Sequence, residues 1–272
     1  MFAFRLLLAV LTLSMAGHAI AQERARPERI GGKPNLNGIW QALNTAYWNI
    51  EGHSAEGLGE FWELGALAAI PAGQSVIVGG TIPYRPEALA RRDENRAGWP
   101  ATDPEAKCYM PGIPRATYLP HPFQIVQGES NIILFSYSFA NANRPVFMNP
   151  DEHIIAPVDL WMGRSNGSWD GDTLVIEVNS NIEDTWFDRA GNHHSNAMIV
   201  TERYTLLDDY LMQYEATIED PQTFTEPWTI RMPLYRHAED NARLLEFNCV
   251  EYAEELLYGD LMTRGPPPSA GQ

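Results

Sequence analysis

The chain has 272 residues and a formal net charge of −16, because 35 Asp and Glu residues outnumber 19 Lys and Arg residues. Nucleic acids and anionic membranes bind proteins through clustered Lys and Arg side chains, so this charge argues against both as partners. It is typical of an exported protein that its own charge keeps dispersed. The length is ample for a sizeable core in one large β domain, or in one domain with an appendage.

The N-terminus has the pattern of a secretory signal peptide. Arg5 supplies a positive charge, an apolar run follows from residue 6 to residue 17, and Ala19 and Ala21 are typical of a cleavage site. This run is shorter than the ~20 residues that a membrane-spanning helix needs. The alternative to a cleaved signal peptide is an uncleaved anchor. We therefore predict a signal peptide over residues 1–21, a flexible leader over residues 22–34, and a periplasmic or secreted mature protein.

The chain contains two cysteines, Cys108 and Cys249. An isolated pair in an oxidising compartment is usually a disulfide, so we predict a bond that ties the N-terminal third to the last predicted strand. The sequence has no C-x-x-C, which argues against a thiol redox motif or a cysteine zinc site.

The first strand signal lies near Gly38-x-Trp40, which resembles the start of lipocalin-like barrels, where the Trp closes one barrel end. After it, residues 54–97 are predicted to form an N-terminal helical excursion. Pro86 and Glu87 are well suited to begin a helix. An earlier short helix, capped by Ser54, would bury the apolar residues Phe61, Leu64, Leu67 and Ala68. The excursion either covers an open barrel mouth or packs on the outside.

Proline dominates residues 100–122, which excludes helix and inner strand there and predicts ordered irregular backbone. From residue 123 onward the pattern predicts strands joined by tight turns such as Asp170-Gly171. The predicted strands are Phe123–Gln127, Asn131–Phe139, Arg144–Met148, Ser168–Trp169, Thr173–Val178, Ala197–Leu206, Tyr210–Ile218, Trp228–Tyr235 and Leu244–Val250.

These strands predict a mainly β protein: an antiparallel meander that closes into a lipocalin-like barrel, because closure removes exposed strand edges. The barrel is a single domain over residues 35–262, followed by a disordered tail over residues 263–272. Glu202 alternates in phase with Met198, Val200 and Tyr204. If this face lines a barrel, the carboxylate of Glu202 must be paired or functional, whereas on a solvent face it carries no information.

The loop between strands 173–178 and 197–204 holds the densest group of titratable residues, and loops held by strands commonly carry sites. We predict His194 or His193 as a general acid or base, because the histidine pKa lies near neutrality, with Asp188 fixing the tautomer. Neighbouring histidines on extended backbone point to opposite sides, so one of them faces a given pocket. The alternatives are a structural histidine pair, or a metal site completed by His153, Asp188 or Glu202, although no H-E-x-x-H spacing is present.

The segment from Gly163 to Gly167 matches G-x-S-x-G, the pattern around the serine of many hydrolases. That pattern requires a following helix, and here a predicted hairpin follows. A serine hydrolase is therefore not expected, and we predict that the glycines serve the turn into the hairpin.

A second group of candidates, Arg115, Tyr118 and His121, lies in the proline-rich segment. Arg and Tyr side chains held on rigid backbone can bind a carboxylate, a phosphate or a phenol. The alternative is that Arg115 pairs with one of the surplus carboxylates. Trp186 belongs to a large set of Trp and Tyr side chains that either form the core or line a cavity for an aromatic or apolar ligand.

Taken together, several segments resemble a large group of uncharacterised exported bacterial proteins that share W-x-G-x-S-x-G-x-W-[DE]-G-D-T-L-V. The resemblance covers most of residues 34–250 and brings no established activity. It implies that His194, Asp188 and Glu202 lie in the most recognisable segments of the group. The matching segments are Pro122–Gln127, Trp161–Val175, Trp186–Asp188, His194–Ser195, Thr201–Tyr204 and Asp220–Pro221.

These features predict an exported small-molecule-binding β-barrel protein. The leading hypothesis for its activity is a cofactor-free lyase, isomerase or hydratase, because no nucleotide or haem motif is present. In that hypothesis the histidine pair and Asp188 act on a small aromatic or anionic substrate that contacts Glu202, Arg115 and Tyr118. The alternatives are a non-catalytic carrier of an apolar or aromatic ligand and a metal-dependent hydrolase. The sequence does not predict an oligomeric state.

Overall fold

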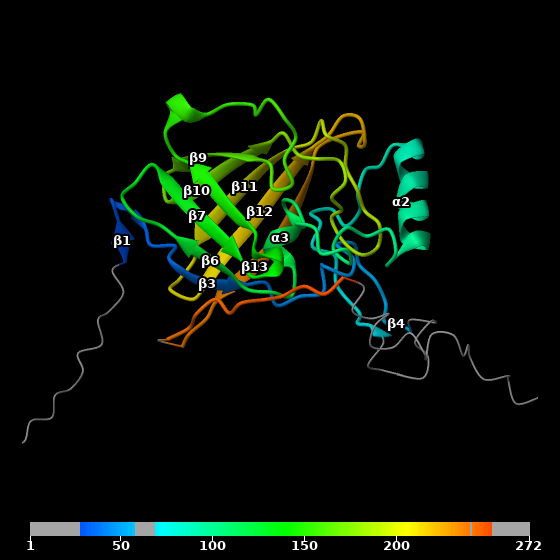
Figure 1. The fold of residues 1–272 in the computed structure, drawn as a ribbon, viewed down its shortest axis with the longest axis horizontal. Helices are drawn as coiled ribbons and strands as arrows, with labels where there is room; N and C mark the ends of the chain where they lie inside the picture. Colours follow the sequence, from blue (N-terminus) through cyan, green and yellow to red (C-terminus); the bar gives the residue numbers. More distant parts are fainter. Residues whose placement is uncertain (1–27, 58–68, 240, 252–272) are drawn as a thin grey trace, which may run out of the picture.

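The structure is a computed structural model that describes residues 28–57, 69–239 and 241–251. Nine strands form a closed barrel in the order β10-β11-β12-β13-β3-β6-β7-β8-β9 (Figure 1). Their bounds are β3 (Gly38–Gln41), β6 (Phe123–Val126), β7 (Ile132–Tyr137), β8 (Asn143–Phe147), β9 (Arg164–Asp170), β10 (Thr173–Asn179), β11 (Ile199–Leu206), β12 (Leu211–Glu219) and β13 (Trp228–Arg236). The predicted mainly β, barrel-forming fold is confirmed.

The barrel is mixed rather than wholly antiparallel. Strands β8 and β9 run parallel and share a short ladder, in which Val146 pairs with Ser165 and Phe147 with Asn166. The chain between them leaves the barrel through the short 3₁₀ turn η3 (Pro150–Glu152), which allows β9 to start in the same direction as β8. The G-x-S-x-G segment therefore runs into a strand: Gly163 has a φ of +62° just before β9, while Gly167 lies inside it.

Turn chemistry and alternation explain the antiparallel part of the barrel. Asp170 pairs with Thr173 across Gly171, whose φ of +59° suits a two-residue hairpin turn. In β11 the side chains of Val200, Glu202 and Tyr204 are 0% exposed, because alternate residues of a strand point into the barrel. Strands β12 and β13 bury alternate side chains in the same way, so side chains fill the barrel interior.

Trp40 on β3 belongs to the hydrophobic core. Its side chain is fully buried and its Nε1 donates a hydrogen bond to the carbonyl oxygen of Leu36 at 2.9 Å. The guanidinium of Arg236, which pairs with Trp40 across β3 and β13, lies 4.4 Å from the indole centroid. The segment Gly38-x-Trp40 therefore forms part of a barrel strand with a buried Trp.

The helical excursion is confirmed in its second half. Helix α2 (Pro86–Gly98) begins at Pro86, as predicted, and lies beside the loops at one end of the barrel (Figure 1). The first predicted helix falls largely on residues 58–68, outside the described residues; around them β4 (Glu56–Gly57) pairs with β5 (Ala69–Ile70). The proline-rich segment was predicted to be irregular, but it contains one helical turn, α3 (Arg115–Tyr118). A short 3₁₀ turn, η2 (Phe139–Asn141), lies after β7.

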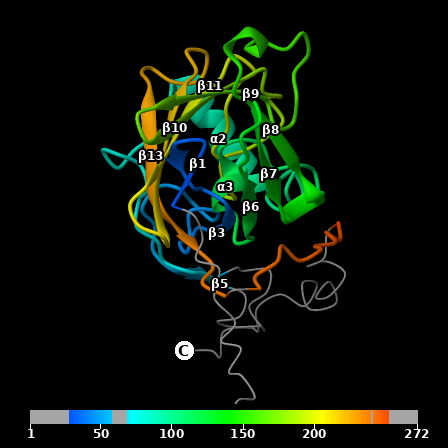
Figure 2. The ribbon, with the colours of Figure 1, turned by 90° about the vertical axis from the view of Figure 1, so that its left-hand side faces the viewer.

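The C-terminal strap, defined here as residues 241–251, runs along one edge of the barrel (Figure 2). The predicted strand Leu244–Val250 is wrong, because this segment has no ladder partner among the described residues. The disulfide between Cys108 and Cys249 holds the strap, with the two Cα atoms 5.6 Å apart, and confirms the predicted bond. Its other contacts include side-chain bonds to strap carbonyls, such as that from Ser138 Oγ to Leu245 at 3.2 Å, and ring contacts of Phe247.

At the N-terminal end, part of the segment predicted as a flexible leader is ordered. Strands β1 (Arg29–Ile30) and β2 (Lys33–Pro34) form a ribbon, and Arg29 forms an ion pair with Asp172. The predicted signal peptide and C-terminal tail lie outside the described residues. None of the helices in the described part has the length and apolar character needed to cross a membrane.

Candidate functional site

Glu202 lies at the centre of a polar cluster inside the barrel. Its carboxylate binds the guanidinium of Arg144, and it accepts hydrogen bonds from Tyr204 Oη at 2.9 Å and Tyr214 Oη at 2.8 Å. Arg144 in turn donates from Nε to Ser165 Oγ at 2.7 Å. The side chains of Arg144 and Glu202 are at most 1% exposed. Glu202 is thus paired rather than presented to a pocket, and its carboxylate contacts neither predicted histidine.

His194 is buried, and protein atoms occupy both of its ring nitrogens. Nδ1 donates to the carbonyl oxygen of Ser195 at 2.9 Å, so Nε2 accepts the hydroxyl hydrogen of Thr185 at 2.7 Å. A carbonyl can only accept, which assigns the neutral Nδ1–H tautomer. Burial lowers the pKa of His194 to about 4. This ring is neutral at pH 7 and already fully hydrogen-bonded, so the geometry does not support it as a general acid or base.

His193 points to the other side of the loop, as expected for neighbouring residues on extended backbone. Its Nε2 donates to the carbonyl oxygen of Ala88 on helix α2 at 2.9 Å, and its Nδ1 is buried without a partner among the described residues. Burial also lowers the pKa of His193. The ring therefore joins the loop to α2 and is not presented to solvent.

Asp188 organises the loop instead of orienting a histidine. Its carboxylate accepts from the backbone nitrogens of Ile50 at 2.9 Å, Ala190 at 3.0 Å and Asn192 at 3.2 Å, and from Asn192 Nδ2 at 2.7 Å. Burial raises its pKa to about 6, against the lowering effect of these bonds. No hydrogen bond among the described residues joins Asp188 to either histidine ring, so the predicted tautomer-fixing contact is corrected.

The histidine metal site, which was the alternative hypothesis, is not assembled among the described residues either. His153 binds the carbonyl oxygen of Phe147 at 2.9 Å, Glu202 lies inside the barrel, and His193 lies against α2. Among the described residues, no group of three or more His, Cys, Asp or Glu side chains is placed to hold a metal ion.

Arg115 belongs to a buried ionic network. It donates two bonds of 2.8 Å to the carboxylate of Asp103 and a third, of 2.6 Å, to Glu105. Glu105 also accepts two bonds from Arg189, at 3.0 and 2.8 Å. The two arginines hold the pKa of Glu105 at about 2, although burial acts to raise it. Arg115 is only 1% exposed. The structure therefore favours the alternative for Arg115, pairing with carboxylates of the chain, over binding a ligand.

Tyr118 and Trp186 lie apart from the cavities that Arg189 and His121 line. Tyr118 is fully buried and donates its hydroxyl hydrogen to the carbonyl oxygen of Phe187 at 2.8 Å. Trp186 lines a shallow, polar cavity of about 390 Å³ together with Trp161 and Asp184. Neither side chain shares a described cavity with Arg189 or His121.

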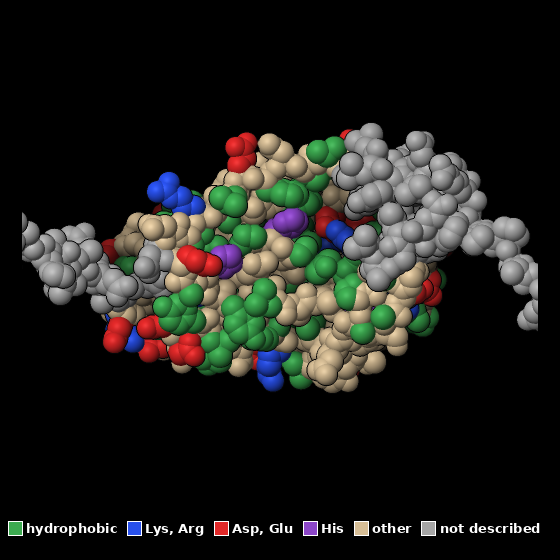
Figure 3. Space-filling view, turned by 90° about the horizontal axis from the view of Figure 1, so that it is seen from below, with side chains coloured by type: hydrophobic (Ala, Val, Ile, Leu, Met, Phe, Trp, Pro, Cys, Tyr) green, Lys and Arg blue, Asp and Glu red, His purple; other side chains and the backbone are tan. Residues whose placement is uncertain are grey.

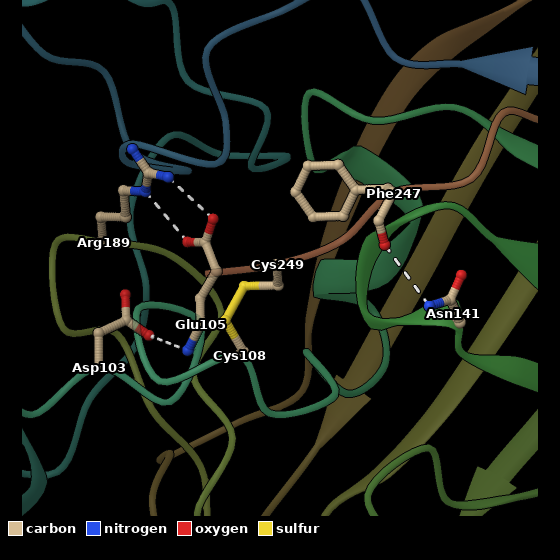
Figure 4. Close-up of a disulfide and its surroundings, with 7 residues drawn as sticks. All are labelled: Asp103, Glu105, Cys108, Asn141, Arg189, Phe247 and Cys249. Carbon is tan, nitrogen blue, oxygen red and sulfur yellow. Dashed lines mark hydrogen bonds and ion pairs between the residues drawn. A yellow bond between two sulfur atoms is a disulfide. The ribbon is translucent and has the colours of Figure 1, made fainter. Parts of the chain in front are cut away.

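Arg189 is the most exposed member of this ionic network, and it lines a cavity. Its guanidinium lies 4.5 Å from the ring centroid of Trp48, 5.4 Å from that of Tyr47 and 6.0 Å from that of Trp99. The side chain is 20% exposed. Its Nε and Nη2 bind Glu105, while Nη1 points away from that carboxylate and makes no hydrogen bond to the described residues (Figure 4).

Two adjoining cavities meet at Arg189 and Trp99, and we name the pair the Arg189 cleft. The first cavity is about 320 Å³ and the second about 300 Å³. The first is lined by Trp48, Asn49, His53, Ser54, Glu56, Gly57, Ile70, Arg96, Trp99, Arg189 and Ala190. The second is lined by Trp99, Pro100, Asp103, Glu105, Ala106, His121, Phe139, Arg189, Phe247, Asn248, Cys249 and Val250.

His121 is the predicted site residue that the structure does place in a cavity. Its ring is 4.4 Å from the centroid of Phe247 and 5.6 Å from that of Phe139. Burial lowers the pKa of His121, while the carboxylate of Glu105 acts to raise it. The face seen from below gathers histidine and hydrophobic side chains, next to a recess where acidic and basic side chains meet (Figure 3).

Sequence reasoning gave no role to Trp99 or Glu105; it placed Arg189 in the titratable loop and Trp48 among the tryptophans that could line a cavity, without choosing either as a site residue. They come from three separate irregular segments, and no spacing motif links them. The one available signal was an Arg surrounded by titratable residues in the loop before β11. Comparisons with models of known protein families, with curated proteins and with solved structures found no match to this chain.

Proposed function

We propose that this chain is an exported small-molecule-binding protein that holds a planar aromatic carboxylate in the first cavity of the Arg189 cleft. The aromatic ring lies against Trp48, Trp99 and Ile70, and the carboxylate lies at Arg189. Of the activities predicted from the sequence, this is closest to the non-catalytic carrier, with the site at the end of the barrel rather than in its interior.

The observation that carries the proposal is that the guanidinium of Arg189 is held in place while its Nη1 makes no hydrogen bond to the described residues. Two hydrogen bonds to Glu105 and the face of Trp48 hold it in one orientation, so little side-chain entropy is lost when a ligand binds. Its Nη1 edge remains available to an acceptor. An arginine edge is well matched to a carboxylate, because it offers parallel N–H donors.

The charge around the first cavity favours an anion. Arg189 and Arg96 line it as cations, while Glu56 is the single carboxylate in the lining and already lies 3.2 Å from Arg96. The negative charge of Glu105 is shared between Arg189 and Arg115. A ligand carboxylate would therefore meet more donors than acceptors.

The size and walls of the cavity favour a small aromatic body. A cavity of roughly 150 Å³ is enough to hold benzene, so about 320 Å³ accommodates a single ring with a short acidic side chain. Trp48 and Trp99 lie 5.7 Å apart, edge to face, and provide aromatic surface at the wall.

The test compares 3-phenylpropionate with its uncharged analogue 3-phenylpropan-1-ol, by calorimetry and by the fluorescence of the cleft tryptophans. A charge-assisted hydrogen bond contributes about 1.5–3 kcal/mol, so the acid is expected to bind roughly 10- to 100-fold more tightly than the alcohol. Equal affinity for the two compounds, or no binding of either, would refute the proposal.

Variants then locate the effect. Arg189→Gln is expected to remove the preference for the acid, and Arg96→Gln to reduce it. The matched control is Arg231→Gln, since Arg231 is 54% exposed like Arg96 and pairs with Glu215 away from the cleft. Because Arg189 also neutralises buried Glu105, the unfolding midpoint of each variant is measured alongside its affinity, and the Arg96 variant gives an answer if Arg189→Gln does not fold.

A further inference from the structure

The second cavity of the Arg189 cleft contains a histidine with the features of a general base. Among the described residues, the ring of His121 makes no hydrogen bond, whereas the rings of His193 and His194 are held by protein atoms. His121 lines the cavity with Glu105 and Arg189. A general base must be able to reach its substrate proton, and this ring is free to do so.

Burial is the main effect that favours the neutral, basic form of His121; the charge of Glu105 opposes it, and the charge of Arg189 acts in the same direction as burial. Asp103, Glu105 and Arg189 are the charged residues of the cavity lining, while the strap and the η2 turn present only the uncharged rings of Phe247 and Phe139. Burial outweighs the attraction of Glu105 and lowers the pKa of His121. Glu105 stays ionised beside it, so an imidazolium formed during a reaction would be stabilised by a fixed negative charge.

The walls of the second cavity suit an apolar substrate. Trp99, Phe139 and Phe247 supply aromatic surface, and the strap closes one side where the disulfide ties it to Cys108 (Figure 4). The positive charge of Arg189 in the same lining can stabilise a developing oxyanion. The cavity thus combines a base, a cation and aromatic side chains.

We propose that the second cavity is the active site of a cofactor-free isomerase that moves a proton along a small unsaturated ketone, with His121 as the general base. This activity goes beyond the ligand binding proposed for the first cavity. His121 takes a proton from the carbon between the carbonyl and the alkene. The C–H electron pair forms a new C=C bond to the carbonyl carbon, and the C=O π pair moves to oxygen beside Arg189.

The second half-reaction restores His121. The oxygen pair re-forms the carbonyl, and the dienolate takes the same proton from the imidazolium at the γ carbon. The product is the conjugated ketone, one C–H bond has been broken and one formed, and no oxidant, reductant or metal is consumed. The substrate class is therefore a small, apolar β,γ-unsaturated ketone.

The probe is cyclohex-3-en-1-one, whose conversion to cyclohex-2-en-1-one is followed by the ultraviolet absorbance of the conjugated product. The wild-type protein is expected to accelerate this conversion over buffer. His121→Gln is expected to lower the catalysed rate at least ~100-fold, the size typical of losing a general base. His237→Gln is the control, because His237 lies at the end of β13 and contacts Gln41 at 3.2 Å outside the cleft; its rate is expected to equal that of the wild type.

A pH profile of the wild-type protein provides a second readout that does not depend on any variant. The rate is expected to fall in acid with a midpoint below the usual histidine pKa of 6.5, because protonated His121 cannot accept a proton. No acceleration by the wild-type protein, a rate that does not fall in acid, or full activity in His121→Gln would each overturn the isomerase. None of these outcomes affects binding of 3-phenylpropionate, which is measured separately in the first cavity.

Discussion

Replacing Glu202 with Gln tests whether the polar centre of the barrel is a structural ion pair. Gln keeps the size of the side chain and an oxygen that can accept from Tyr204 and Tyr214, but it removes the negative charge beside Arg144. Arg144 would then remain as a buried cation with Ser165 Oγ and Tyr137 Oη as its polar partners.

The expected loss of unfolding free energy is large because both partners are at most 1% exposed. Removing one member of a buried ion pair typically costs about 3–5 kcal/mol, since the other charge is left uncompensated away from water. An exposed pair contributes only about 0–1 kcal/mol. Arg203→Gln is therefore the matched control: Arg203 lies on the same strand, binds Asp170 at 2.8 Å, and is 39% exposed.

The assay is urea unfolding of the wild type, Glu202→Gln, Arg144→Met, the double variant and Arg203→Gln. The double variant should be more stable than the sum of its single changes predicts, because no buried charge remains in it. The reasoning is refuted if Glu202→Gln loses no more stability than Arg203→Gln, or if the two single losses simply add.

Two further predictions concern pH and the disulfide. Burial lowers the pKa of His194 from 6.5 to about 4, so the unfolded chain binds a proton that the folded one does not: the stability is complete above pH 6.5 and falls by about 3 kcal/mol as the pH drops to 4. His194→Gln should lose less stability than the wild type over this pH range when unfolding is measured as a function of pH. Asp188, whose pKa is raised from 3.8 to about 6, gives the opposite slope, but it does so in the wild type and in the variant and therefore cancels in the comparison. Equal losses in the two proteins would contradict the lowered pKa of His194. Cys249→Ser should lower the free energy of unfolding by about 2–4 kcal/mol, because the bond closes a sequence separation of 141 residues; an unchanged urea midpoint would show that the strap is held by its other contacts.

Much of the barrel follows from local sequence chemistry. Asp170-Gly171 sets a hairpin because glycine readily adopts the positive φ that the turn needs. Alternation in β11 places Glu202 inside, and the need to pair a buried carboxylate follows from burial alone. Pro86 begins α2 for the same local reason, and two cysteines leave a single possible intramolecular bond.

The failures of sequence reasoning have a common physical origin in partners that are distant along the chain. Leu244–Val250 has the composition of a strand, but a strand also needs a neighbour to receive its hydrogen bonds, and the disulfide places this segment where the described structure offers none. In the same way, nothing local shows that the carbonyl oxygen of Ala88, 105 residues earlier, occupies Nε2 of His193.

The sequence by itself determined the class of fold, the disulfide, the inward face of β11 and the candidate His121. Only the tertiary structure decided which titratable groups are available for chemistry. A nitrogen or oxygen is available only if it is not already hydrogen-bonded within the protein. For Arg189 the contacting residues are Glu105 and Trp48, which lie 84 and 141 residues earlier in the chain. Periodicity and turn chemistry act over a few residues, so they specify strands and turns, whereas a cleft depends on segments that meet only once the barrel has closed.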